Sequence, residues 1–341
     1  MSPPPAALAP AAAEGAILLS PASTADLHEA ALRRQAFFAV VLAAICIGFS
    51  AIFVRLADVG PAAVGFWRLV FALGPTIIWA VAEQRALERR APRAPGTPRV
   101  LFTRRQLFIS MMAGLFFGAD LVAFHLGLAH TTTANALLIA NLAVVIVMVI
   151  GWLALGERPS RGLLLALVLS LGGTVLIISR SAAAVPGDGV SVYGDVLCMA
   201  AAACYAGYML MTRLVRRSGQ SHGPALGGGM VSLIAASTAA IFCLVWAVAA
   251  GETLVPSSLQ GLLAVVGLGL VAHATGQGLT TFALGRLQAG LISVVLLLQI
   301  VVGTSMAALL FGEIPSLMVA IGGAMVVAGI VVARPGKPQP R

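Results

Sequence analysis

Long runs of apolar residues, separated by short polar segments, occupy most of this chain. The runs are roughly 18–24 residues long, which is the length of an α-helix that crosses the hydrocarbon core of a bilayer. They lack the apolar–polar alternation of a membrane β-strand, so we expect helices rather than a closed barrel. The pattern predicts an all-α polytopic membrane protein with ten transmembrane helices, at residues 35–54, 62–82, 107–128, 132–155, 162–178, 193–212, 226–250, 259–284, 289–311 and 317–333.

A short sequence near the middle of the chain returns close to its end. GERPS at 156–160 is followed by GEIPS at 312–316, an offset of 156 residues, and each copy lies between two long apolar segments. Two copies of a unit with five spans must be inserted upside down relative to each other. Inverted repeats of this kind are the usual architecture of secondary transporters, with the substrate site where the repeats meet.

The repeat and the polar segments divide the chain. Residues 1–35 are rich in Pro and Ala, and they lack the basic region and apolar core of a signal peptide. We expect a disordered cytoplasmic tail at 1–35, a first five-helix repeat at 36–180, a linker at 181–192, a second repeat at 193–334 and a cytoplasmic tail at 335–341.

Composition supports a membrane protein. Hydrophobic residues make up 60% of the chain and charged residues 10%, whereas soluble domains carry about 25% charged residues. The net charge of +9 is explained by the positive-inside rule rather than by nucleic acid, because an N-terminus in the cytoplasm places 18 of the 21 Lys and Arg residues on the cytoplasmic side. We therefore expect a multi-pass protein of the inner (plasma) membrane, with both termini cytoplasmic and no nucleic-acid partner.

The sequence contains none of the motifs that would indicate an enzyme. The four cysteines lie inside apolar segments and lack the spacing of a metal site. Gly-x-Ser-x-Gly, His-Glu-x-x-His and phosphate-loop motifs are missing, and no polar stretch is long enough for a nucleotide-binding domain. We expect no catalysis, no metal and no cofactor.

Two charged residues fall inside predicted spans. Ionisable groups are costly there, so each is a functional candidate. Asp120 is the only carboxylate placed deep in a span and Arg68 the only arginine, and both lie in the outer half at similar depth. They either form a buried ion pair that joins two helices, or one or both bind substrate or carry protons. His125 and His273 also fall within spans, either as hydrogen-bonded neutral side chains or as members of a proton relay.

Neutral polar residues within the spans are candidates for a cavity lining. Asn141 and Gln299 precede the two Gly-Glu pairs at similar distances, so both would face a central cavity if the repeats pack about a pseudo-two-fold axis. Glu157 and Glu313, by contrast, stand just before predicted helices. We expect each to cap the helix that follows it, since acidic groups are favourable at a helix N-terminus.

These features together resemble the EamA-type family of the drug/metabolite transporter superfamily. The matching sequences are FWRLVFAL at 66–73, GADLVAFHLGLAHTTTANALLIANLAVVIVMVIGWLALGERPS at 118–160 and AALLFGEIPS at 307–316, and the resemblance extends from about 36 to 334. The family usually has a proline about thirteen residues before each glutamate, where this chain has Val144 and Ile300. Gating through a proline kink is therefore not expected, and glycines would take that role.

The resemblance implies ten helices in two inverted five-helix repeats around a central cavity, with alternating access that does not use ATP. It implies Arg68 and Asp120 near an outer gate. The residues that it places in the cavity lining are Asn141, Tyr205, Gln277 and Gln299. Candidates for proton coupling are Asp120, His125 and His273.

The function expected on these grounds is export of a small organic metabolite or amphipathic compound by proton antiport. Its partners would be that solute, protons and the lipid bilayer. Direction is not encoded in the sequence, so an importer or exchanger of a nucleoside-like or amino-acid-derived metabolite is an alternative. A non-transporting scaffold or lipid scramblase is a third possibility.

Overall fold

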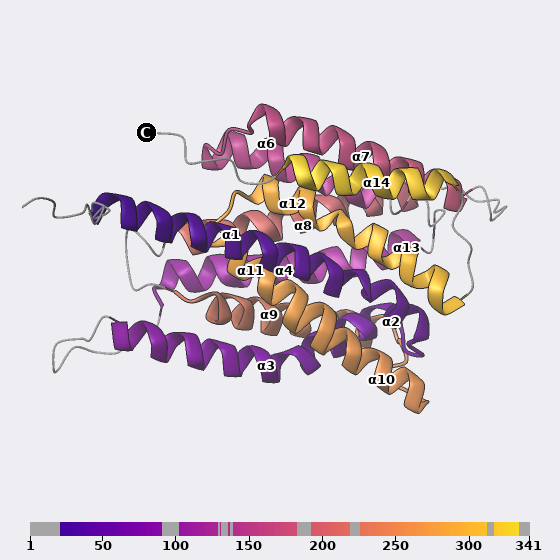
Figure 1. Cartoon of the computed structure of the whole chain (residues 1–341). Coiled ribbons are helices and arrows are strands. Elements are labelled where there is room, and N and C mark those ends of the chain that lie inside the picture. The colour runs from indigo at the N-terminus through magenta and orange to yellow at the C-terminus, as the bar shows by residue number, and fades with distance from the viewer. Residues whose placement is uncertain are drawn as a thin grey trace, which may run out of the picture.

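The computed structural model describes residues 21–90, 102–128, 130, 136, 139–182, 192–218, 226–311 and 317–333. All regular elements in these residues are helices, which run side by side along the length of one bundle (Figure 1). They are Pro21–Gly48 (α1), Ser50–Leu56 (α2), Pro61–Arg90 (α3), Arg104–Leu128 (α4), Ala143–Leu155 (α6), Arg161–Ala182 (α7), Val192–Ser218 (α8), Gly228–Ala249 (α9), Leu259–Gly267 (α10), Leu268–Gln277 (η1, a π-helix), Gly278–Leu284 (α11), Ala289–Leu296 (α12), Leu298–Phe311 (α13) and Leu317–Val332 (α14).

Seven helical stretches are long and apolar enough to cross a membrane, and three shorter apolar helices accompany them in the described part of the chain. The expectation of an all-helical membrane protein is confirmed for these residues. The count of ten spans stays a prediction, because Ile139–Leu155, Arg161–Ile177 and Leu317–Val332 are shorter than the others.

Large apolar side chains lie on the outside of the bundle, where lipid would contact them. Leu153 is 75% exposed and Ile78 72% exposed. A soluble protein rarely leaves so many large apolar groups in water, because each costs free energy in proportion to its exposed area. The interior is rich in alanine and glycine, which let helices approach closely, as is typical of helix interfaces in membranes.

The most extensive helix contacts pair α4 with α8 and α9, α3 with α9, and α7 with α14. In the α7–α14 pair the two backbones touch at Gly173 and Gly322. A Cβ atom on either glycine would collide with the carbonyl oxygen of the other. Only glycine allows this approach.

Both described ends of the chain lie at one end of the bundle, since α1 begins and α14 ends at the left of Figure 1. Arg33 of α1 and Ala333 after α14 line one cavity there, together with Arg213, Arg217 and Arg286. We call this the basic end. The opposite end carries Asp58 and Glu252, on the loops before α3 and after α9.

Several helices extend further than their apolar segments. α1 begins at Pro21, so residues 21–34, assigned from the sequence to a disordered tail, are helical. Their Ala, Leu and Glu residues favour a helix, and Arg33 forms an i,i+4 ion pair with Glu29 at 2.7 Å. α3 likewise continues through polar residues to Arg90. The length of an apolar run predicts the membrane span, but it does not predict where the helix ends. Polar residues that favour helices can extend the helix beyond the span.

Three of the predicted spans are interrupted helices. The first is divided at Phe49 between α1 and α2, and the segment 289–311 is divided at Leu297 between α12 and α13. The break at Leu297 lies close to Ile300 and forms without a proline. The segment 259–284 contains the ten-residue π-helix η1, in which Thr275 Oγ1 donates to the carbonyl of Leu270 at 3.0 Å. π-Helical turns are frequent at functional sites.

Some sequence-based expectations concern residues outside the described part of the chain. These are the tail at 1–20, the linker residues 183–191, the C-terminal residues 334–341, and the second Gly-Glu pair, including Glu313.

Candidate functional site

A cluster of polar and aromatic side chains lies inside the bundle, toward the opposite end. Its members come from four elements that are distant in sequence: Arg68 from α3, Phe117 and Asp120 from α4, Tyr205 and Tyr208 from α8, and His273 and Gln277 from η1. Four of the predicted site residues (Arg68, Asp120, Tyr205 and Gln277) and one further candidate for proton coupling (His273) therefore meet in a single region. We call these seven residues the central cluster.

Arg68 is the most unusual member of the central cluster. The side chain is 8% exposed, and its Nε is buried without a hydrogen-bond partner. Its guanidinium carbon lies 5.7 Å from the centre of the Phe117 ring, a cation–π arrangement. An aromatic face does not replace the hydrogen bonds that a buried guanidinium loses on leaving water. Arg68 is therefore positioned to accept a partner that the described protein residues do not supply.

Asp120 lies one helical turn after Phe117, on the same face of α4, and is half-buried. Arg68 and Asp120 are close enough to interact electrostatically. In the part of the chain that the structure describes, however, neither an ion pair nor a hydrogen bond joins them. The two charges thus face the same region without neutralising each other directly.

Aromatic rings form one side of the central cluster. Phe117 packs between Tyr208, at 4.8 Å between ring centres, and His273, at 5.4 Å. The Tyr208 hydroxyl donates to Gln277 Oε1 at 3.5 Å, and Tyr205 lies 6.0 Å from Tyr208. His273 and Gln277 are both buried, and the Nδ1 atom of His273 has no hydrogen-bond partner in the described part of the chain. These rings offer an apolar surface with a few polar atoms, which is the common lining of a small-molecule site.

Three predicted site residues make none of these ring contacts or hydrogen bonds, although His125 is close enough to Arg68 to interact with it electrostatically. His125 Nδ1 is 2.6 Å from the carbonyl oxygen of Leu121 on its own helix, so that ring nitrogen already has a partner. Asn141 and Gln299 are half-buried beside the starts of α6 and α13. Neither belongs to the contacts that define the central cluster, and their assignment to a cavity lining stays a prediction.

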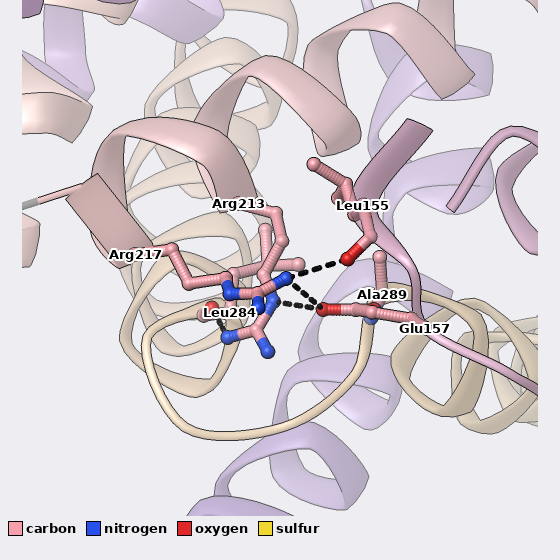
Figure 2. Close-up of polar contacts among 6 residues, drawn as sticks. All are labelled: Leu155, Glu157, Arg213, Arg217, Leu284 and Ala289. Carbon is pink, nitrogen blue, oxygen red and sulfur yellow. Dashed lines mark hydrogen bonds and ion pairs between the residues drawn. The ribbon is translucent and has the colours of Figure 1, made fainter. Parts of the chain in front are cut away.

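Glu157 connects distant parts of the chain at the basic end (Figure 2). Its Oε1 accepts from Nε of Arg213 on α8 at 2.7 Å, and its Oε2 accepts from the backbone N–H of Ala289, the first residue of α12, at 2.9 Å. The side chains of Glu157 and Arg213 are only 8% and 10% exposed. We call these three residues the Glu157 network. It joins the turn between α6 and α7 to two elements of the second half of the chain.

The surrounding arginines bind backbone carbonyl groups (Figure 2). Arg213 Nη1 donates to the carbonyl of Leu284, at the end of α11, at 2.6 Å. Arg217 Nη1 donates to Leu155, at the end of α6, at 2.8 Å, and lies 3.9 Å from Glu157 Oε1. Cations near a helix C-terminus are favourable, because the unsatisfied carbonyls there carry partial negative charge.

The local structure explains the Gly-Glu sequence but corrects the role expected for Glu157. Gly156 ends α6 with a φ of 67°, a left-handed conformation that favours glycine. The hydroxyl of Ser160 caps α7, accepting from Leu163 N–H at 3.1 Å. Glu157 instead caps α12, because the turn directs its carboxylate away from α7 and toward the start of that helix.

Two further glutamates cap helices, one at each end of the α3–α9 pair. Glu252 Oε2, just after α9, accepts from the N–H groups of Ala62 and Ala63 in the first turn of α3, at 2.8 and 3.0 Å. Glu83 Oε2, on α3, accepts from Gly229 N–H in the first turn of α9 at 2.8 Å. Each helix of this antiparallel pair is thus capped by a glutamate near the end of the other.

Asp58 adds a polar connection at the opposite end. Its Oδ2 accepts from Ser257 Oγ at 2.7 Å and from the N–H groups of Ser257 and Ser258 at 3.1 and 2.8 Å. These hydrogen bonds hold the pKa of Asp58 below its usual value, and the bond from the Ser257 side chain has the largest effect. Nearby, Trp67 Nε1 donates to the carbonyl of Leu254 at 2.6 Å. Both ends of the bundle are therefore tied by contacts between its two halves.

Sequence reasoning missed Glu83, Arg213 and Glu252, because each lies just beyond the end of a predicted span. One signal was present. Gly251-Glu252 is a third Gly-Glu pair after an apolar helix, and Gly251 has the same φ of 67° as Gly156. Among the described residues, no group of three His, Cys, Asp or Glu side chains is arranged to hold a metal ion.

Comparison with known proteins identifies the family. The sequence profile of the EamA-like transporter family matches residues 34–179 and again residues 192–334. The chain belongs to the EamA-like transporter family. A solved structure titled "Crystal structure of protein" has a TM-score of 0.70, with 20% identity over 88% of this chain and 96% of that one, which shows a shared fold. No curated protein matches the chain.

Family membership confirms the resemblance seen in the sequence. The two matched segments each contain one Gly-Glu pair of the GERPS/GEIPS repeat. The chain is thus a membrane protein of the drug/metabolite transporter type. The central cluster draws Arg68, Phe117 and Asp120 from the first matched segment and the other four residues from the second.

Proposed function

We propose that this EamA-like protein is a secondary active transporter with ten spans in two inverted five-helix repeats. It moves a small organic metabolite or amphipathic compound across the inner membrane, outward and in exchange for protons, with both termini in the cytoplasm. The family assignment supports transport. The position of the central cluster, between contacts that tie both ends of the bundle, supports alternating access.

The observation that carries this proposal is the buried guanidinium of Arg68, whose Nε has no hydrogen-bond partner among the described residues. A buried charge without a partner costs several kcal/mol relative to a paired one, so its retention favours a role in which a ligand supplies the missing hydrogen bonds. The solute would place an electron-rich group on Arg68 and an apolar part against Phe117 and Tyr205. The neighbouring amide of Gln277 and ring of His273 offer further polar contacts.

Asp120 is the proposed proton carrier. It is half-buried, faces the same region as Arg68 and forms no ion pair with any of the described residues. Protonation would remove its negative charge and so change how strongly Arg68 attracts an anionic or polar group. Proton binding and solute binding would then be linked through the same pair of side chains.

Alternating access needs the two ends to open in turn. At the basic end the Glu157 network is the contact to be broken, since it joins α8 and α12 to the first half. The α3–α9 pair, capped at both ends by Glu83 and Glu252, would move as a unit. The breaks at Phe49 and Leu297 give the neighbouring helices places to bend.

The test is transport by purified protein in liposomes, using a broad metabolite mixture with and without an imposed pH gradient. We expect gradient-dependent accumulation of one compound class. Asp120→Asn should abolish the dependence on the gradient while the protein stays folded. Asp195→Asn makes the same chemical change in the first turn of α8, outside the central cluster, and should leave transport unchanged.

Other outcomes favour the alternatives. Accumulation that ignores the pH gradient but requires a counter-solute would indicate an exchanger, and accumulation driven in the opposite direction an importer. Wild-type, gradient-dependent rates in Asp120→Asn would remove Asp120 from the mechanism. Lipid redistribution without solute uptake would indicate a scramblase, and neither activity would favour a scaffold.

A further inference from the structure

A cavity of about 630 Å³ opens at the basic end of the bundle, away from the central cluster. Its walls come from α1, α6, α7, α8, α12 and the loops beside them. Among its described lining residues are four arginines and one carboxylate: Arg33, Arg213, Arg217, Arg286 and Glu157. The lining therefore carries a clear excess of positive charge.

The protein neutralises this charge only in part. Arg213 forms an ion pair with Glu157. Arg217 lies 3.9 Å from the same carboxylate, so a single negative charge faces two arginines. Arg286 lies 4.1 Å over the ring of Phe282 and makes one long hydrogen bond, at 3.4 Å, to the carbonyl of that residue. These are contacts with neutral groups, so the positive charge of Arg286 remains available to a ligand.

Two further acidic groups act on these arginines. Glu29 pairs with Arg33 on the same helix at 2.7 Å, and the exposure of both side chains makes that pair weak. Glu83 attracts Arg286 electrostatically but accepts from the backbone of Gly229. Neither glutamate is part of the described cavity lining.

The chemistry of the lining selects a class of ligand. Arginine side chains present several N–H donors in a planar fork that matches the oxygen atoms of a phosphate group. Apolar side chains of Leu155, Leu163, Leu287 and Leu291 lie beside them. The cavity thus suits an anionic phosphate group, carried either by a soluble molecule or by a lipid whose acyl part continues along the apolar wall.

We propose that this cavity is a binding site for a phosphate-bearing anion and that its occupancy weakens the Glu157 network. Arg213 and Arg217 line the cavity and also contact Glu157. A phosphate group that binds these guanidinium groups competes with the carboxylate. Bound anion therefore favours separation of the α6–α7 turn from α8 at the basic end.

Direct binding measurements on the purified full chain test this site without reference to transport. Inorganic phosphate is titrated by calorimetry against protein in a neutral detergent. In parallel, the protein is reconstituted in vesicles of phosphatidylcholine alone or mixed with phosphatidylglycerol, and its resistance to unfolding is compared. Chloride at matched ionic strength controls for screening.

Two substitutions should weaken phosphate binding. Arg286→Gln and, separately, Arg33→Gln each remove a lining charge and should each lower the affinity by about ten-fold, the scale of one charge-assisted hydrogen bond. Arg105→Gln removes the same charge from an exposed position at the same end of the bundle, outside the cavity. That control should bind as the wild type does.

Glu157→Gln gives the opposite result and makes the test specific. It removes the competing carboxylate but leaves all four arginines, so phosphate should bind more tightly than to the wild type. Stabilisation by phosphatidylglycerol but no binding of inorganic phosphate would identify a lipid headgroup, and the reverse a soluble ligand. No effect from either probe would overturn the proposal. So would equal losses in Arg286→Gln and Arg105→Gln.

Discussion

Glu83 and Glu252 lie at opposite ends of the α3–α9 pair, and each caps the other helix of the pair: Glu83, on α3, accepts from the first turn of α9, and Glu252, just after α9, accepts from the first turn of α3. Both helices therefore have a carboxylate at the N-terminus, where the helix dipole favours negative charge. Because the two glutamates belong to opposite halves of the chain, this arrangement stabilises the contact between the halves at both ends of the helix pair.

Removing either cap should destabilise the protein. Glu252→Ala leaves two N–H groups of α3 without an acceptor and should cost about 1–2 kcal/mol, and Glu83→Ala about 1 kcal/mol. Unfolding of the purified variants in mixed micelles, followed by circular dichroism, measures both. Glu88→Ala is the matched control, because Glu88 lies on α3, as Glu83 does, but makes no hydrogen bond among the described residues. Losses no larger than that of Glu88→Ala would rule out a capping role.

Arg68 and Asp120 should be energetically coupled although no ion pair joins them. The two side chains interact electrostatically across a poorly hydrated interior, which screens charges only weakly. A double-mutant cycle with Arg68→Gln and Asp120→Asn should give a coupling energy on the order of 0.5–3 kcal/mol. Simple additivity of the two substitutions, within experimental error, would argue that the side chains act independently.

Exchanging the charges of Glu157 and Arg213 should restore stability only in part. Glu157→Gln leaves Arg213 largely buried without its counter-ion and should cost about 3 kcal/mol or more. In the variant that combines Glu157→Arg with Arg213→Glu, an ion pair can form again. An arginine at 157, however, has no acceptor for the N–H of Ala289, so a deficit of about 1 kcal/mol should remain. Full recovery in unfolding experiments would show that the contact with α12 is dispensable.

Asp58 should make stability depend on acid pH. The pKa of Asp58 is lower in the folded protein than in the unfolded chain. Its contribution to the free energy of unfolding is therefore complete above the unfolded pKa, which is about 4. The contribution is lost as the pH falls through the folded pKa. Asp58→Asn should therefore be less stable than the wild type at neutral pH, and the difference should shrink below about pH 4. A difference that stays constant across this range would contradict the assignment.

The sequence predicted the membrane segments well where apolar length alone decides them. The segments 259–284 and 289–311 begin and end where the structure places them, because lipid requires an apolar helix of fixed length. The sequence marked Arg68, Asp120 and His273 as candidates because ionisable groups are costly inside a span, and the family resemblance added Tyr205 and Gln277. That these five residues lie in one region was not predicted.

Contacts between distant residues could not be predicted in the same way. Ala289 lies 132 positions from Glu157, and nothing in its own type marks it as a partner. The separation of Arg68 from Asp120 depends on how α3 and α4 are rotated, and both helices pack against the small buried residues of α9. Helix ends outside the membrane were also missed, because polar residues such as those at 83–90 continue a helix without any apolar signal.

The contact between Gly173 and Gly322 has a mechanical consequence. Because the two backbones already touch, one helix cannot slide or rotate against the other without driving a carbonyl group or a side chain into it. α7 and α14 therefore form a rigid frame that links the two halves of the chain. Any rearrangement during a transport cycle has to take place in the remaining helices, which move relative to that frame.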